Sequence, residues 1–395
     1  MRYPPPPFFL QQNAHELEAV EAVEITKGKT AYFDKKMTDC LKGTALIFMY
    51  IHHLFTFPQW YIEEISYPEL ENFARIYCMP FKICVCIFAF LTGYTYFFQK
   101  EKTLKYSFKK ILLFMSAYWT VYAGMLALYV LFGKECPSIK TIVYELFALK
   151  RPVMVFCWYV SFYCMAMLAL PILSTLMDGG KIKDICIGII APIILSNGLM
   201  PFVQVRSQSI GECLQSFCGW FPCVAIGLIV AKHSVFEEDF DKALNYMKSN
   251  SIKVGICLIM IVASFLGRYC MPSMSFGTIS TAKGAQNLSI SFDVLYTPIF
   301  IYALVNLLHQ VKRFKTFFVA KELLQKIGQK SMLMWFLHCV VLNQCKDIFQ
   351  RIIYFPKNPI FVLIWALVFF YAMACIVDYP LRKVTAFEKR CLSNI

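Results

Sequence analysis

The chain has 395 residues, of which 58% are hydrophobic and only 16% are charged. An average soluble domain carries roughly 25% charged residues. The apolar residues form blocks near the roughly 20 residues that a bilayer requires, and these blocks are apolar on all faces. Composition therefore argues against a large soluble helical enzyme. The basic residues behind the net charge of +14 lie between the blocks without a nucleic-acid-binding motif, which indicates a lipid bilayer and no nucleic acid as the partner.

The N-terminal residues differ from the rest of the chain. The first forty are polar, contain a proline run at positions 4–7 and show no cleavable signal peptide. We expect a cytoplasmic tail at residues 1–40, a transmembrane domain at 41–378 and a second cytoplasmic tail at 379–395.

Ten apolar blocks follow in chain order. Each is expected to be a helix, because lipid offers the backbone no hydrogen-bond partner. The predicted fold is therefore an all-α, polytopic integral membrane protein with about ten transmembrane helices. The predicted spans are Leu41–Phe57, Phe73–Phe98, Ile111–Phe132, Val153–Leu176, Ile185–Met200, Cys213–Ala231, Ile252–Leu266, Leu288–Leu308, Ser331–Cys345 and Ile360–Val377.

The distribution of basic residues predicts the orientation. With the N-terminus in the cytoplasm, alternate segments between the ten spans contain 27 of the 39 Lys and Arg residues on the inner side. The first outer loop is acidic, with Glu63, Glu64, Glu69 and Glu71. This asymmetry is what the positive-inside rule predicts when both termini are cytoplasmic.

The seventeen cysteines give no sign of a metal site. They include no Cys-x-x-Cys pair, and Cys213, Cys218 and Cys223 are spaced five residues apart, which suits no zinc site. Cysteine also packs as a small apolar residue, which is the favoured interpretation.

Ionisable residues inside the predicted spans are candidates for function, because they are costly in lipid. They are His52, His53, Lys82 and His338. Lys42 opens the first span, and eleven helical steps place it roughly 16 Å from His53 along the axis, offset by only about 20° around it. Both side chains are therefore expected to face the same way, with a cation near the cytoplasm and an imidazole deeper in the membrane.

This arrangement suits a long donor with a charged end and a reactive end. A cation can bind phosphate, and histidine is a good general base near neutral pH. Other interpretations stay open. Either histidine can instead bond a neighbouring helix, Lys82 can extend to the interface or pair with a carboxylate, and His338 can be a packing group.

Five stretches, in order, carry a family resemblance. They are Leu41–His53 with a basic residue and a histidine separated by ten residues, Lys82–Tyr94 ending in Thr-Gly-Tyr, Trp158-Tyr159, Gly328–Ser331 followed by Trp335–His338, and Asp378-Tyr379-Pro380. Together they resemble the acyltransferase 3 family of membrane acyltransferases, over roughly Leu41 to Arg390. The family's basic residue is usually Arg, and Lys42 keeps the charge without the bidentate fork. Thr92 stands where the family has Ser.

The resemblance implies an acyl-CoA-dependent O-acyltransferase. The acyl group, expected to be acetyl, would come from cytoplasmic acetyl-CoA, and the acceptor would be a hydroxyl of an extracytoplasmic or lipid-linked saccharide. The implied catalytic residues are His53 and His338, the implied donor-binding residues are Lys42 and Lys82, and no metal is expected. The plasma membrane is the expected location.

Two other classes remain possible. A transporter or flippase of a glycan or other solute also fits ten helices with buried ionisable groups, although no paired, broken spans in two related halves are visible. A sensor or scaffold would not require Lys42 and His53 to share one wall. Glu145, Arg151 and Asp293 lie near the expected outer face, where solvated loop charges are favoured over contacts with a sugar.

Overall fold

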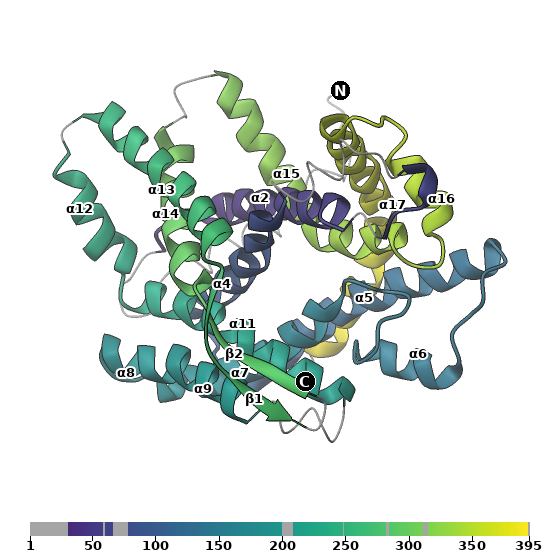
Figure 1. Cartoon of the computed structure of the whole chain (residues 1–395), viewed down its shortest axis with the longest axis horizontal. Helices are drawn as coiled ribbons and strands as arrows, with labels where there is room; N and C mark the ends of the chain where they lie inside the picture. The colour runs from purple at the N-terminus through teal and green to yellow at the C-terminus, as the bar shows by residue number, and fades with distance from the viewer. Residues whose placement is uncertain are drawn as a thin grey trace, which may run out of the picture.

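The computed structural model describes residues 31–57, 60–65, 78–199, 208–247, 249–281, 284–310 and 315–393, most of which are helical (Figure 1). The predictions that concern residues 1–30 and 66–77, including Glu69, Glu71 and the start of the second span, lie outside the described residues. The α-helices are α2 (Lys35–Phe55), α4 (Ile83–Phe97), α5 (Leu104–Leu131), α6 (Ile139–Leu146), α7 (Trp158–Leu176), α8 (Lys181–Ile185), α9 (Ala191–Gly198), α11 (Gln208–Lys232), α12 (Lys242–Asn245), α13 (Asn250–Cys270), α14 (Asp293–Gln310), α15 (Lys315–Leu337), α16 (Lys346–Ile353) and α17 (Pro359–Ser393).

Short turns of other helix types join several of these elements. Turns of 3₁₀ helix occur at η2 (Glu63–Ile65), η3 (Met79–Lys82) and η7 (His338–Val341). Turns of π-helix occur at η4 (Cys186–Ile190) and η5 (Phe236–Asp241). Two of these turns contain predicted functional residues. Lys82 ends η3, which leads into α4, and His338 begins η7, which follows α15.

Six helices in the described part of the chain are long and apolar enough to cross a membrane. They indicate a multi-pass membrane protein. The six segments are Met79–Phe97, Leu104–Leu131, Trp158–Leu176, Ile210–Lys232, Asn250–Cys270 and Pro359–Glu388. They correspond to six of the ten predicted spans, so the number ten and the orientation of the termini remain predictions.

None of the other four predicted spans matches one long, strongly apolar helix among the described residues. The first is α2, whose opening turns carry Lys35, Lys36 and Lys42. The fifth is divided among α8, the π-turn η4 and α9. The eighth is α14, with an internal proline, and the ninth begins inside α15 and continues into η7.

The expected all-α fold needs one correction. Strands β1 (Ser273–Thr281) and β2 (Gly284–Ser291) form a two-stranded antiparallel hairpin between α13 and α14. The predicted span Leu288–Leu308 therefore starts in a strand, and its helix begins only at Asp293. The hairpin is rich in Ser and Thr, and its backbone is tied to α9, since Asn197 Nδ2 donates to Ser289 O at 3.1 Å and Asn197 Oδ1 accepts from Ser289 N at 2.8 Å.

Two close helix pairs form the centre of the molecule. α2 lies against α15, and α4 lies against α11 (Figure 1). In the first pair, a Cβ added at Gly328 would lie 1.8 Å from Asp39 O, and one at Gly43 would lie 2.1 Å from Leu324 O. Only glycine permits such an approach of two backbones. Tyr50 adds a cross-link, donating to Met334 O at 3.0 Å.

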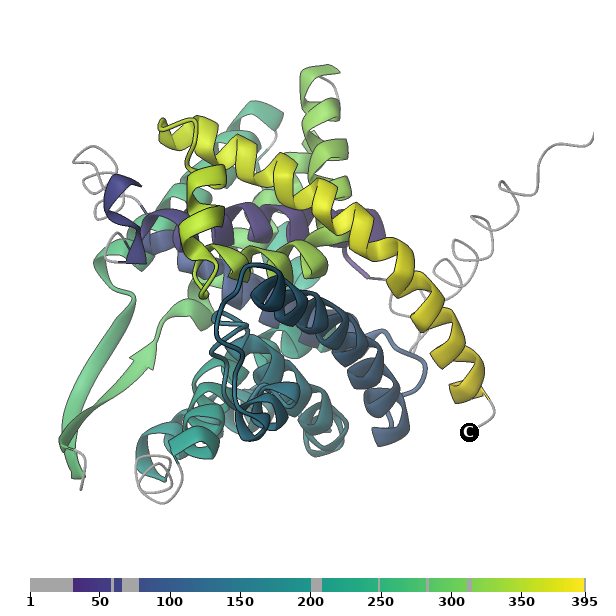
Figure 2. The same cartoon turned by 90° about the vertical axis from the view of Figure 1, so that its right-hand side faces the viewer.

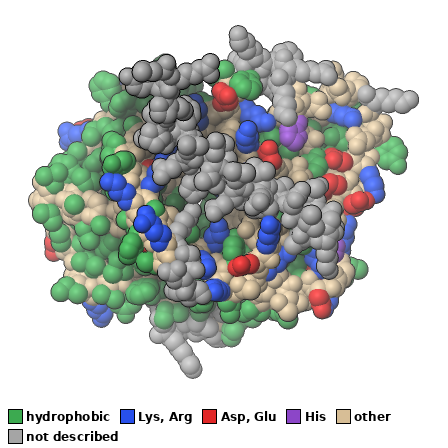
Figure 3. Space-filling view, turned by 180° about the vertical axis from the view of Figure 1, so that it is seen from behind, with side chains coloured by type: hydrophobic (Ala, Val, Ile, Leu, Met, Phe, Trp, Pro, Cys, Tyr) green, Lys and Arg blue, Asp and Glu red, His purple; other side chains and the backbone are tan. Residues whose placement is uncertain are grey.

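The outer helices differ from this centre in burial. In the apolar stretches of α4 and α11, 61% of the residues are buried inside the protein, compared with 11% in α13 and 22% in α17. The long helix α17 runs obliquely across the molecule, and its C-terminal end lies on the side opposite the β-hairpin (Figure 2). On the face seen in Figure 3, hydrophobic side chains cover much of one half, and Lys and Arg side chains gather toward the middle. Exposed apolar faces of this kind suit contact with lipid.

Candidate active site

One stripe of α2 faces a cavity of about 680 Å³. The helix begins where Asp34 Oδ1 accepts from Met37 N at 2.7 Å, a standard N-cap. From there Lys35, Asp39, Lys42 and His53 all line the cavity. The steps between them are four, three and eleven residues, each close to a whole number of turns, which keeps them on one face of the helix. The structure therefore places Lys42 and His53 on the wall of a single cavity.

The His53 imidazole is held by aromatic neighbours. Its ring is parallel to Phe156, with centroids 4.0 Å apart and planes 12° apart. Its Nδ1 lies 2.8 Å from Nε2 of His338. Nδ1 of His338 in turn donates to the backbone carbonyl of Trp335. His338 is 1% exposed and does not line the cavity, so it reaches the cavity only through His53.

Charged groups from two helices gather at the other part of the cavity. The Asp39 side chain is only 6% exposed and lies 3.8 Å from Lys42 Nζ and 3.5 Å from Lys35 Nζ. Lys110 of α5 also lines the cavity. Three lysines and one aspartate give this region a net positive charge. This charge would attract an anionic group of a ligand. The Asp39 carboxylate partly offsets the charge of Lys35 and Lys42.

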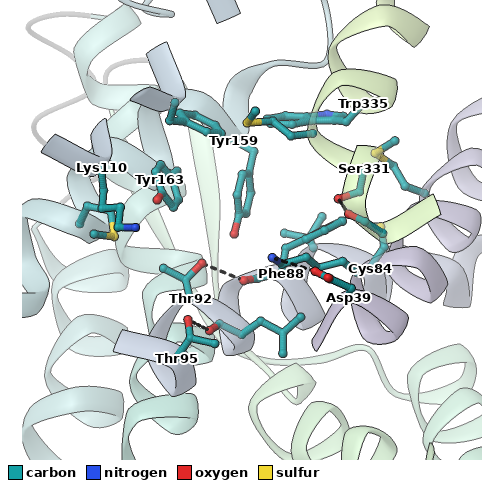
Figure 4. Close-up of a pocket in the computed structure, with 18 of the residues that line it drawn as sticks. Asp39, Cys84, Phe88, Thr92, Thr95, Lys110, Tyr159, Tyr163, Ser331 and Trp335 are labelled. Carbon is teal, nitrogen blue, oxygen red and sulfur yellow. Dashed lines mark hydrogen bonds and ion pairs between the residues drawn. The ribbon is translucent and has the colours of Figure 1, made fainter. Parts of the chain in front are cut away.

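The remaining walls come from α4, α5, α7 and α15, and they mix aromatic and hydroxyl side chains (Figure 4). Thr92 donates to Phe88 O at 2.9 Å, and Ser331 donates to Gly328 O at 2.8 Å. Figure 4 shows Tyr159 reaching toward the middle of the cavity. Its hydroxyl is buried and makes no hydrogen bond of good geometry with a described residue, although the Thr92 side chain lies close to it. A buried unpaired donor in a cavity wall calls for an explanation, and a substrate oxygen would provide one.

The structure separates His53 from His52. His52 does not line the cavity; its Nδ1 lies 3.4 Å from Cys78 O and 3.1 Å from Thr56 Oγ1. Thr56 is the residue that ends α2, and Cys78 directly precedes η3, so both contacts of His52 lie away from the cavity. Of the two adjacent histidines, only His53 faces the space where a ligand fits.

Lys82 lies apart from Lys42, so the expectation that both lysines bind the donor stays a prediction. Lys82 lies in η3, at the start of α4, and does not line the cavity. Its Nζ lies 5.4 Å from the centre of the Trp220 ring. The physical reason is topological: α4 begins near the end of α2 that carries His52, whereas Lys42 belongs to the opposite end. Of the two lysines predicted to bind the donor, Lys42 is the one that lines the cavity.

Several cavity residues were not predicted as site residues from the sequence, among them Asp39, Lys110 and Tyr159. Asp39 and Lys110 lie in charged, polar stretches that are typical of a cytoplasmic surface. Tyr159 entered the sequence analysis only as part of a Trp-Tyr pair. The i, i+3 spacing of Asp39 and Lys42 was a usable signal for the first. The Trp158-Tyr159 pair in the family resemblance was a usable signal for Tyr159. No sequence signal marks Lys110, because its place in the cavity depends on helices that meet only in the fold.

Other charges singled out from the sequence have structural partners. Asp378 accepts from Lys330 Nζ and Arg382 Nε, both at 2.6 Å. Asp293 lies 3.0 Å from Arg268 and is buried, so it is not the solvated charge that was expected. Across the described ranges, no group of three His, Cys, Asp or Glu residues is arranged to bind a metal ion.

Comparison with known proteins identifies the family. Searches of curated proteins and of solved structures find no match. The model of the acyltransferase 3 family, described as an acyltransferase domain, matches residues 38–379. The match begins just before Asp39 and Lys42 and includes every cavity residue described above except Lys35. The chain belongs to the acyltransferase 3 family, a family of membrane acyltransferases.

Proposed function

We propose that the protein transfers an acyl group, acetyl in the simplest case, from cytoplasmic acyl-CoA to a hydroxyl of an extracytoplasmic or lipid-linked saccharide. The observation that carries this proposal is the position of Lys42 and His53 on one cavity of about 680 Å³. That volume is within the usual range for small-molecule sites. Membership of the acyltransferase 3 family supplies the reaction class.

The cationic region suits the phosphates of the donor. Coenzyme A carries several phosphate charges at one end and the thioester at the other. Lys42, with Lys35 and Lys110 nearby, offers charge-assisted hydrogen bonds to these phosphates. Asp39 balances Lys42 while no anion is bound, and it sets the lysine side chain on the cavity side of α2.

His53 suits the role of general base in this proposal. Its Nε2 would take the proton from the acceptor hydroxyl while the hydroxyl oxygen attacks the thioester carbonyl. The carbon–sulfur bond then breaks, the new ester leaves with the acceptor, and the coenzyme A thiolate takes the proton back from the imidazolium. Tyr159 is a candidate donor to the oxygen that becomes negative during the attack.

The test uses membrane vesicles from cells that make the protein, supplied with radiolabelled acetyl-CoA. Label is expected in the saccharide fraction with the wild-type protein and with His52→Gln, and not with His53→Gln. The two variants share the same substitution at neighbouring positions, so a general loss of folding affects both. Equal labelling by His53→Gln and the wild type would overturn the proposal. Solute movement without acyl-CoA would favour the transporter interpretation instead.

A further inference from the structure

We infer that His338 is a positioning residue that determines which ring nitrogen of His53 carries the proton. The inference rests on the acyl-transfer function proposed above and adds a role that the cavity lining does not reveal. Two consecutive hydrogen bonds lead from a backbone carbonyl of α15 to the wall of the cavity.

The first bond fixes the protonation of His338. A backbone carbonyl oxygen can only accept a hydrogen bond, so Nδ1 of His338 must carry the hydrogen that reaches Trp335 O. A neutral imidazole has one N–H group. Nε2 of His338 therefore presents a lone pair.

The second bond transfers this constraint to His53. Nδ1 of His53 lies 2.8 Å from Nε2 of His338. Because Nε2 of His338 is the acceptor, Nδ1 of His53 is the donor and carries the hydrogen. Nε2 of His53 then has the lone pair that a general base requires, and no other described residue hydrogen-bonds to it.

The ring geometry supports a true hydrogen bond between the two histidines. Their centroids are 5.0 Å apart and their planes differ by 14°. With nitrogens at 2.8 Å, these values mean that the rings meet edge to edge in nearly one plane, as an in-plane lone pair demands. Phe156 lies parallel to both rings, at 4.0 Å from His53 and 5.5 Å from His338, and keeps them in this plane.

The consequence for the reaction is specific. If His53 adopted the other tautomer, the cavity would meet an N–H group that cannot accept the proton of the acceptor hydroxyl. Loss of His338 should therefore lower kcat, because His53 would no longer be held in the tautomer that can accept a proton. It should leave the KM for acetyl-CoA nearly unchanged, because the donor phosphates are bound at the other part of the cavity.

The test compares His338→Phe and His338→Gln with His52→Phe as the matched control, a buried histidine outside the cavity that also contacts a backbone carbonyl. We expect His338→Phe to lower kcat by about 10² to 10⁴, the range for a base in the wrong state, with KM within about threefold. His338→Gln should recover much of kcat, because its amide oxygen can accept from His53 Nδ1. His52→Phe should stay near the wild type.

A second measurement does not depend on activity. In protein labelled with ¹⁵N-histidine, with the His53 signals assigned by comparison with His53→Ala, Nε2 of His53 should be unprotonated in the wild type. In His338→Phe it should be protonated in part of the molecules. A protonated Nε2 in the wild type, or equal kcat values for His338→Phe and the wild type, would overturn the inference. If His53→Ala is itself fully active, the proposed function fails; if only His338→Phe is active, this inference alone fails.

Discussion

Replacing Gly328 by alanine should damage both stability and activity. The added Cβ would lie 1.8 Å from Asp39 O and 2.6 Å from Asp39 C, whereas real contacts rarely fall below 3.0 Å. Both neighbours are backbone atoms, so no side chain can rotate away. α2 and α15 must therefore separate by about 1.2 Å. Overpacking of this kind costs about 1–3 kcal/mol, against a gain of about 1 kcal/mol from the helix propensity of alanine.

The shift should have a larger effect on catalysis than on folding. A misplacement of about 1 Å can lower a rate by about 10², and the residues that move with α2 include Lys42 and His53. Unfolding in a detergent titration and labelled acetyl transfer would measure the two effects. The matched control is Gly255→Ala in α13, where an added Cβ meets nothing within 4 Å. If Gly328→Ala unfolded at the same midpoint as Gly255→Ala and kept wild-type activity, the close contact of the two helices would be refuted.

Three further outcomes are expected. Lys42→Ala should raise the KM for acetyl-CoA by about tenfold through loss of a charge-assisted hydrogen bond, whereas Lys42→Arg and the exposed Lys36→Ala should stay within about threefold; kinetics over a range of acetyl-CoA concentrations would check this. Tyr159→Phe should keep or increase stability, because it removes a buried unpaired hydroxyl, yet lower kcat by at least about tenfold; a parallel loss of stability would contradict the assignment. Burial raises the pKa of Glu145, in α6, from 4.5 to about 7. The folded state thus favours the protonated carboxyl, so wild-type stability should fall as pH rises from about 4.5 to 7, and Glu145→Gln should remove that dependence in melting curves.

Hydropathy predicted the most apolar helices well and the more polar ones poorly. α5, α7 and α17 are continuous apolar runs, and their positions follow directly from the requirement that lipid imposes on the backbone. α15 begins at Lys315, far before the predicted start at Ser331, because its first half carries Lys321, Lys326 and other polar residues. Those residues lie in a helix that packs closely on α2, which a hydropathy pattern cannot reveal.

In the site, too, the sequence predicted what lies within one helix and not what depends on contacts between helices. Helical periodicity was enough to place Lys42 and His53 on one face of α2, since both residues lie in one regular element. It could not show that His338 bonds to His53, because 285 positions separate them in the chain. Nor could it exclude Lys82 from the cavity, since that depends on where α4 starts relative to α2.

The glycine contact joins α2 and α15, and the paired histidines lie in α2 and in the turn η7 that directly follows α15. On α2, Asp39 lies at the close contact and His53 lies fourteen residues later; on α15, Gly328 lies at the contact and Trp335 follows it just before the turn that holds His338. Helices this short are nearly rigid rods, so a separation at Gly328 is carried toward the far end. A displacement of about 1.2 Å would stretch the 2.8 Å bond between His53 and His338 beyond hydrogen-bond range. The proposed base, His53, therefore depends on a backbone contact about 20 Å away along α2, and Gly328→Ala should alter the protonation of His53 as well as the packing.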